Sequence, residues 1–208
     1  SAKISGVDGK VPGVNTTGAG RLNLENALKL PLSAEPLSLS FGGGSGDVNM
    51  TKTIKFTNLS GSDDVFSVAV DKLSGDASIE LGENTISLAA GESKDLSVSV
   101  KGSGIAAGSQ QGWLVLKGNK SDSEMRVAFW YGVRGSEPKD VSVIYEDSGS
   151  PGQLVRSAFI VRVLDASGLP IDGITPEVTV ESGRATIQAI EPIGDIPGTW
   201  VVSTRIST

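Results

Sequence analysis

Apolar and polar residues alternate with a period of two along much of this sequence. The alternating runs are 37–41, 54–56, 66–70, 96–100, 114–116 and 127–131. Because successive side chains of a strand point to opposite faces, this pattern is typical of half-buried strands in an antiparallel sheet. Turns rich in Gly, Ser, Asn and Asp separate the runs. About seven strands in about a hundred residues indicate an immunoglobulin-type β-sandwich.

The same alternation predicts which side chains form the core of this first module, residues 33–134. The inward set is Leu39, Phe56, Phe66, Val68, Val98, Leu114, Leu116 and Phe129. Trp113 and Trp130 have the opposite parity, so we expect at least one of them outside the core. There it would cover a loop, the N-terminal segment or an interdomain contact. Trp113 and Trp130 are therefore the candidate interaction surface, although aromatics at alternate strand positions more often pack in the core or on the sheet surface.

Residues 135–140, which include Gly135 and Pro138, are typical of a linker, and a second β module is expected over 141–208. Its predicted strands are 141–145, 157–163, 176–180, 185–190 and 200–206. An immunoglobulin-like sandwich has about seven strands, so we expect this module to be truncated or completed by a missing partner. The fold class predicted for the whole chain is all-β: two immunoglobulin- or fibronectin-III-like modules in tandem.

Residues 1–32 contain the only helical pattern. Asn23 is a predicted N-cap, and Leu24, Ala27 and Leu28 follow at helical spacing before Pro31 ends the helix. A single short helix is unstable by itself, so we expect it to dock on another surface or to be extended or mobile. The first residue is Ser1, which suggests a fragment of a longer protein.

The charge and the residue types restrict the chemistry open to this chain. It has 18 Lys and Arg against 24 Asp and Glu, a net charge of −6. This argues against nucleic acid and anionic membrane surfaces as partners, and no apolar run is long enough for membrane insertion. The chain has no Cys and no His, which removes thiolate catalysis, zinc–thiolate sites and the commonest general base. We expect no cofactor, no catalytic residue and no metal site.

Two motifs have a more ordinary interpretation than the functional one they suggest. The glycine-rich run 42–46 lacks the Gly-Lys-Ser/Thr that opens the helix of a phosphate loop. The carboxylates lie in turns or near strand ends and do not follow the EF-hand order, which favours solvated turns over calcium binding. They are Asp63, Asp64, Asp71, Asp76, Glu80 and Glu83. A calcium site assembled from distant loop residues stays open at this point.

Residues 18–28, Gly-Ala-Gly-Arg-Leu-Asn-Leu-Glu-Asn-Ala-Leu, resemble the end of a subtilisin-like catalytic domain. Many large members of that family continue with a fibronectin-III-like domain. The runs 36–42, 51–58, 86–93 and 96–100 resemble its strands, in the same order. Residues 155–206 resemble a bacterial immunoglobulin-like repeat of the invasin type, chiefly through 161–171. The resemblance implies that residues 1–32 are a remnant of a protease catalytic domain.

The catalytic motifs of that family lie before residue 1, so the resemblance transfers no catalytic residue to this chain. It implies a non-catalytic accessory region of a secreted subtilisin-like serine peptidase, acting as a spacer, exosite or protein-interaction region. Its partners would be the parent catalytic domain within the same molecule, and a protein substrate or cell-surface component. The alternative is an independent cell-surface adhesion or carbohydrate-binding module with no linked protease. A third possibility, an unrecognised hydrolase, is testable by activity of the isolated chain.

Overall fold

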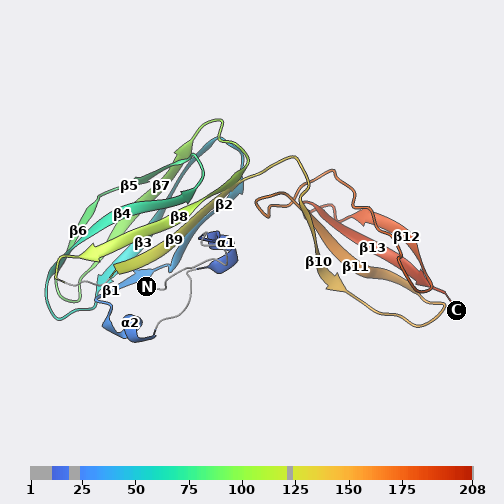
Figure 1. The fold of residues 1–208 in the computed structure, drawn as a ribbon, viewed down its shortest axis with the longest axis horizontal. Coiled ribbons are helices and arrows are strands. Elements are labelled where there is room, and N and C mark those ends of the chain that lie inside the picture. The colour runs from blue at the N-terminus through green and yellow to red at the C-terminus, as the bar shows by residue number, and fades with distance from the viewer. Residues whose placement is uncertain (1–10, 19–23, 121–123, 208) are drawn as a thin grey trace. The chain divides into compact units, whose positions relative to one another are not determined.

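The computed structural model describes residues 11–18, 24–120 and 124–207. The chain divides into two compact units, residues 1–133 and 134–208 (Figure 1). Strands are the main regular secondary structure of both units, which confirms the predicted all-β, immunoglobulin-like fold class.

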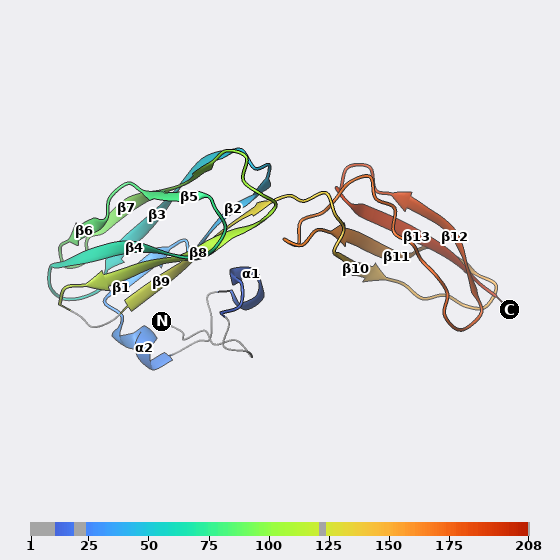
Figure 2. The same cartoon turned by 45° about the horizontal axis from the view of Figure 1, so that its top comes forward.

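Unit 1 is a sandwich of two sheets that lie face to face (Figures 1 and 2). Sheet A has the order β1 (Leu32–Glu35), β3 (Val48–Asn58), β7 (Ser93–Gly102) and β5 (Ser78–Leu81). Sheet B has the order β2 (Ser38–Gly44), β9 (Glu124–Val133), β8 (Gly108–Gly118), β4 (Asp64–Ser74) and β6 (Thr85–Leu88). All neighbouring strands are antiparallel except β2 and β9, which run parallel. The chain therefore leaves sheet A after β1 and enters sheet B at β2.

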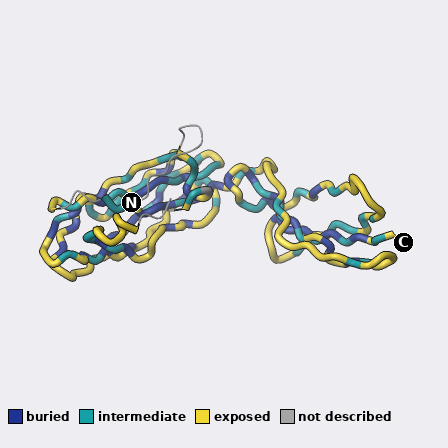
Figure 3. The backbone as a smooth tube through the Cα atoms, turned by 60° about the horizontal axis from the view of Figure 1, so that its bottom comes forward, coloured by how far each residue is buried: buried dark blue, intermediate teal, exposed yellow. Residues whose placement is uncertain are grey.

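The core of unit 1 lies between the two sheets. All eight side chains predicted to point inward belong to one buried cluster, so the parity prediction is confirmed. Phe56, Phe66 and Phe129 are the largest fully buried side chains in it. Buried and exposed positions alternate along these strands, as Figure 3 shows.

The described residues of unit 1 form nine strands, two more than the approximate number predicted. The two unexpected strands, β1 and β5, have four residues each. Each contains only two apolar residues, which is too few to show a period of two. Leu32 and Ala34 of β1 are buried in the core, so the sandwich already includes residue 32.

In residues 11–18 and 24–31, two short helices precede the sandwich: α1 (Val14–Thr17) and α2 (Leu24–Lys29). Helix α2 confirms the helical pattern over Leu24–Leu28, whereas the predicted N-cap Asn23 lies outside the described residues. Of the expected outcomes (extended, mobile or docked on another surface), the extended one does not apply to residues 24–29, which are helical. An ion pair of 2.7 Å joins Lys29 to Glu25 one turn earlier. Within the described ranges, no helix has the length and apolarity needed to cross a membrane.

Unit 2 has one antiparallel sheet in its described residues, with the order β10 (Asp140–Glu146), β11 (Leu154–Leu164), β13 (Thr199–Ile206) and β12 (Ala185–Pro192). Val161, Val163, Trp200 and Val202 form the buried centre of one face. The side chains of Ile174 and Val178, from the irregular segment between β11 and β12, pack against this centre.

The predicted strand over Pro176–Val180 is wrong, because these residues form no ladder with any described strand. Pro176 has no N–H to donate, and the segment instead covers the sheet as irregular chain. At the other end of the unit, the predicted linker is bonded to the module. The N–H of Gly135 donates to Oδ2 of the buried Asp165 at 2.7 Å, and the N–H of Lys139 donates to the carbonyl of Leu164 at 2.7 Å.

Candidate functional site

The outer face of sheet B, turned away from the core, carries both candidate tryptophans. Trp113 on β8 lies opposite Ala128 on β9, and Trp130 on β9 lies opposite Gln111 on β8. Since paired residues of an antiparallel ladder share a face, and positions two apart also do, all four side chains belong to the same face. Trp113 and Ala128 form a small buried cluster with Val14 of α1, separate from the main core.

Trp113 is only 3% exposed because part of this same chain lies on it. The backbone N–H of Val14 donates to Oε1 of Gln111 at 2.7 Å, and Nε2 of Gln111 donates to Oγ of Ser74 at 3.1 Å. This contact holds α1 beside β8 and β9 (Figures 1 and 2). The Val14 side chain belongs to the Trp113 cluster. Of the three contacts considered for a tryptophan outside the core, the structure shows contact with the N-terminal segment for Trp113.

Charged side chains border the Trp113 cluster. The guanidinium carbon of Arg126 lies 5.9 Å from the centroid of the Trp113 ring, within cation–π range. Nε of Arg126 donates to Glu124 at 2.7 Å, and its Nη1 lies 3.6 Å from Asp71. The hydrogen bond from Arg126 lowers the pKa of Glu124, against a smaller opposing effect of burial. The indole Nε1 of Trp113 is buried and has no hydrogen-bond partner among the described residues.

Trp130 is half-buried, and its Nε1 donates to Oγ of Ser109 at 3.1 Å. It lines a cavity of about 270 Å³ together with Val14 and Asn15 of α1, Leu37, and Ala128. The two candidate tryptophans thus lie on one face, but Trp113 is covered by α1, whereas Trp130 is half-buried and lines this cavity. The face is a site of contact with polypeptide that precedes the sandwich.

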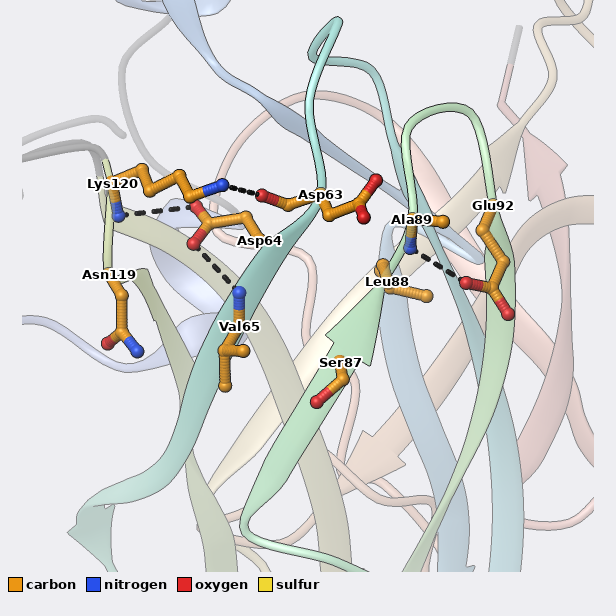
Figure 4. A pocket seen from close by; sticks show the side chains of 9 residues that line it. All are labelled: Asp63, Asp64, Val65, Ser87, Leu88, Ala89, Glu92, Asn119 and Lys120. Atoms are coloured by element: carbon orange, nitrogen blue, oxygen red, sulfur yellow. Dashed lines mark hydrogen bonds between the residues drawn. The ribbon is translucent and has the colours of Figure 1, made fainter.

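A second cavity, of about 360 Å³, lies at the end of the sandwich where β4 and β6 meet the turn after β8 (Figure 4). Asp63, Asp64, Glu92 and Lys120 provide its charges. Asp64 accepts hydrogen bonds from the N–H groups of Val65 and Lys120, at 2.7 and 3.4 Å. Asp63 accepts from the N–H of Ala90, Glu92 accepts from that of Ala89, and Nζ of Lys120 donates to the carbonyl of Asp63. The carboxylates therefore fasten turns to one another.

The carboxylates considered for calcium do not converge. Glu80 pairs with Lys101 at 2.6 Å, and Glu83 pairs with Lys94 at 2.8 Å. Across residues 11–18, 24–120 and 124–207, no three carboxylate side chains lie close enough together to hold a metal ion. This arrangement favours the interpretation as ordinary turn and strand-end residues.

The glycine-rich run 42–46 is explained by close backbone approach. A Cβ at Gly46 would lie 2.3 Å from the carbonyl oxygen of Ile105, whose N–H donates to the carbonyl of Gly46. A Cβ at Gly44 would lie 2.7 Å from the hydroxyl of Tyr131, which donates to the carbonyl of Ser45. Glycine is needed here because two chain segments touch, and the run is followed by strand β3 rather than by a helix.

Comparison with known proteins gives similarity of fold alone. No protein-family model matches the chain, and a search of curated proteins also found no match. Among solved structures, the chain is similar to PapD-like domain 7 of human CEP192, with 10% identity and a TM-score of 0.43 over 51% of this chain and 87% of that domain. A protein of unknown function from Porphyromonas gingivalis has 16% identity and a TM-score of 0.46, covering 86% and 84%.

A third similar structure is the Pseudomonas aeruginosa CupB2 chaperone, with 11% identity and a TM-score of 0.40 over 65% of this chain and 70% of the chaperone. All three TM-scores lie below 0.5, so these similarities give no basis for transferring a function.

Proposed function

We propose that this chain is the non-catalytic accessory region of a secreted subtilisin-like serine peptidase, which acts as a spacer, exosite or protein-interaction region. In this proposal a catalytic domain precedes the chain, and unit 1 packs on it. The protein would be secreted or displayed at the cell surface. Its partners would be the catalytic domain of the same molecule and a protein substrate or cell-surface component.

The observation that carries the proposal is the unpartnered apolar face of α2. Leu24 and Leu28, one helical turn apart, are 68% and 89% exposed, and Ala27 beside them is exposed as well. An amphipathic helix is stabilised chiefly by burying such a stripe, at roughly 1.5–3 kcal/mol for each fully buried leucine. The helix lies in the run 18–28 that resembles the end of a subtilisin-like catalytic domain, so that domain is the natural partner.

The geometry of unit 1 supports the same proposal from another direction. The Trp113 face is covered by Val14, which lies in the same N-terminal segment as α2. This arrangement brings the preceding polypeptide to the outer face of sheet B. A carbohydrate-binding module would instead need an exposed aromatic platform, and neither Trp113 nor Trp130 is exposed. The adhesion or carbohydrate-binding alternative therefore ranks second.

Hydrogen exchange can test the proposal on two proteins: this chain, and the chain extended at its N-terminus through the coding sequence that precedes it. We expect the extension to encode a Gly-Thr-Ser nucleophile motif and to slow the exchange of the α2 amides greatly. The amides of Thr53–Thr57, in the middle of sheet A, serve as the control and should exchange equally in both proteins. Absence of the motif, or unchanged α2 exchange despite a folded extension, would contradict the proposal.

A further inference from the structure

Strand β10 is one of the two edge strands of the unit 2 sheet, and β12 is the other. In the described part of the chain β10 pairs with β11 on one side and with no strand on the other. Free backbone N–H and C=O groups on an edge strand are a template for pairing, and proteins normally blunt them with charges, bulges or a short strand. Here the strand has seven residues and one register shift, between Val143 and Tyr145. It still carries four exposed apolar side chains: Val141, Val143, Ile144 and Tyr145.

The hydrophobic centre of unit 2 is open on the side of β10. Val143 lies opposite Val161, and Val141 lies opposite Val163, so all four share one face of the sheet. Val161 and Val163 are buried, whereas Val143 is 57% exposed and Val141 is 48% exposed. Ile174 and Val178 cover the centre of this face but leave the β10 side uncovered. An apolar strip therefore extends from the core to the free edge.

The two ends of β10 are acidic, whereas Arg162 of β11 lies opposite Ser142 in the middle of β10. Glu137, Asp140, Glu146 and Asp147 lie at its two ends with one cation, Lys139, which gives a net charge of −3. Within the described ranges no ion pair involves any of these five residues. If a second copy of this chain paired along the same edge, two strands that each carry a net charge of −3 would lie side by side. Electrostatic repulsion therefore disfavours self-pairing. A strand with basic ends would be attracted to the same edge.

We propose that the β10 edge binds an extended segment of a partner protein in which β-branched or aromatic residues alternate with polar ones and Lys or Arg stand at the ends. The segment would add a strand to the sheet through main-chain hydrogen bonds. Its apolar side chains would cover Val141 and Val143, and its basic residues would lie beside Glu146 and Asp147. The site belongs to unit 2 and is independent of the peptidase parentage proposed for unit 1.

The probe for this site is a synthetic peptide in which valine and threonine alternate between terminal lysines. The readout is the NMR shift of the backbone amides of the full chain during titration. We expect saturable binding below about 1 mM, with shifts concentrated on residues 140–146. A matched peptide with terminal glutamates should bind at least about tenfold more weakly, which tests the charge argument.

The variant Val143→Lys should weaken binding of the lysine peptide by at least about tenfold. Leu59→Lys is the matched control, because Leu59 is similarly exposed, at 62%, and lies in unit 1. Val143→Thr keeps a β-branched side chain and should reduce the affinity for the peptide less than Val143→Lys does. An unchanged Tm of both variants would show that the loss of affinity does not come from unfolding. Equal binding by Val143→Lys, no saturation, or shifts centred elsewhere would overturn the proposal. If the chain alone formed a dimer and Val143→Lys made it monomeric, the proposal would be overturned, because the occupant of the edge would be a second copy of the chain.

Discussion

The backbone N–H of Val14 donates a 2.7 Å hydrogen bond to the side-chain oxygen of Gln111, although 97 positions separate the two residues in the sequence. This single contact brings the N-terminal segment onto the outer face of sheet B and places the Val14 side chain in the Trp113 cluster. The outer face of sheet B and the N-terminal segment together form the surface by which we expect unit 1 to contact the preceding catalytic domain.

Replacing Val14 by aspartate should detach α1 from sheet B, because a carboxylate in an apolar cluster loses its hydration without gaining a partner. Fluorine NMR of protein labelled with fluorotryptophan would report the result. The Trp113 resonance should move toward its solvent-exposed position, while that of Trp200 in unit 2 stays in place. Val11→Asp, at an exposed position of the same segment, is the matched control. A Trp113 resonance unmoved by Val14→Asp would mean that α1 is not what covers the indole.

Asn58 is fully buried at the end of β3, and its amide group bonds three backbone carbonyls, two in loops and one at the end of β6. Its Nδ2 donates to the carbonyls of Ser62, Leu88 and Ala89 at 2.9, 3.2 and 3.1 Å. Asn58→Ala leaves these acceptors without that donor, so we expect the free energy of unfolding to fall by about 2–4 kcal/mol. Urea denaturation measures the difference.

The exposed Asn49 on the same strand provides the control for Asn58, and Asn49→Ala should change stability by less than about 0.5 kcal/mol. Equal unfolding midpoints for the two variants would show that the buried amide does not hold the loops together.

Glu124 should make the stability of unit 1 depend on pH in acid. Its pKa in the folded protein is lowered, chiefly by the hydrogen bond from Arg126, relative to the ordinary value of 4.5. Its stabilising contribution is therefore complete above that ordinary value and is lost as the pH falls through the lowered folded-state pKa. The unfolding free energy of the parent should exceed that of Glu124→Gln by less than about 1 kcal/mol at pH 7, and the difference should disappear in strong acid.

The control for Glu124 is Glu137→Gln, which changes an exposed glutamate of unit 2 that has no ion pair in the described part of the chain. A difference between parent and Glu124→Gln that grows as the pH falls would have the wrong sign for this mechanism.

The core of unit 1 could be predicted because the period of a strand is fixed by covalent geometry. Once Phe56 and Phe129 are assigned inward, parity also assigns their neighbours, and the structure buries every residue of the predicted set. Short strands such as β1 escape the pattern because two apolar residues define no period. The error at Pro176–Val180 has a related cause, since alternating apolar residues also suit an irregular segment that covers a sheet.

The candidate site was predictable only in part. Parity placed Trp113 outside the core, but it could not identify Val14 as its cover, because that contact depends on the path of the N-terminal segment. The β10 edge was also beyond prediction. The alternation of Val141 and Val143 indicates a strand with an inner face, whereas the structure leaves that face uncovered. The alternation of apolar residues predicts which face of the sheet a side chain belongs to. Whether that side chain is buried depends on the segment that packs against that face.

The central claim, a non-catalytic region that belongs to a serine peptidase, is tested most directly by covalent labelling with a fluorophosphonate probe, which reacts with activated serine nucleophiles. The probe is applied to this chain and to the protein extended through its preceding coding sequence, and the labelled peptide is identified by mass spectrometry. We predict one labelled serine, located before residue 1, in the extended protein and no label in this chain. Labelling of a serine within residues 1–208, or no labelling of a folded extended protein, would contradict the account.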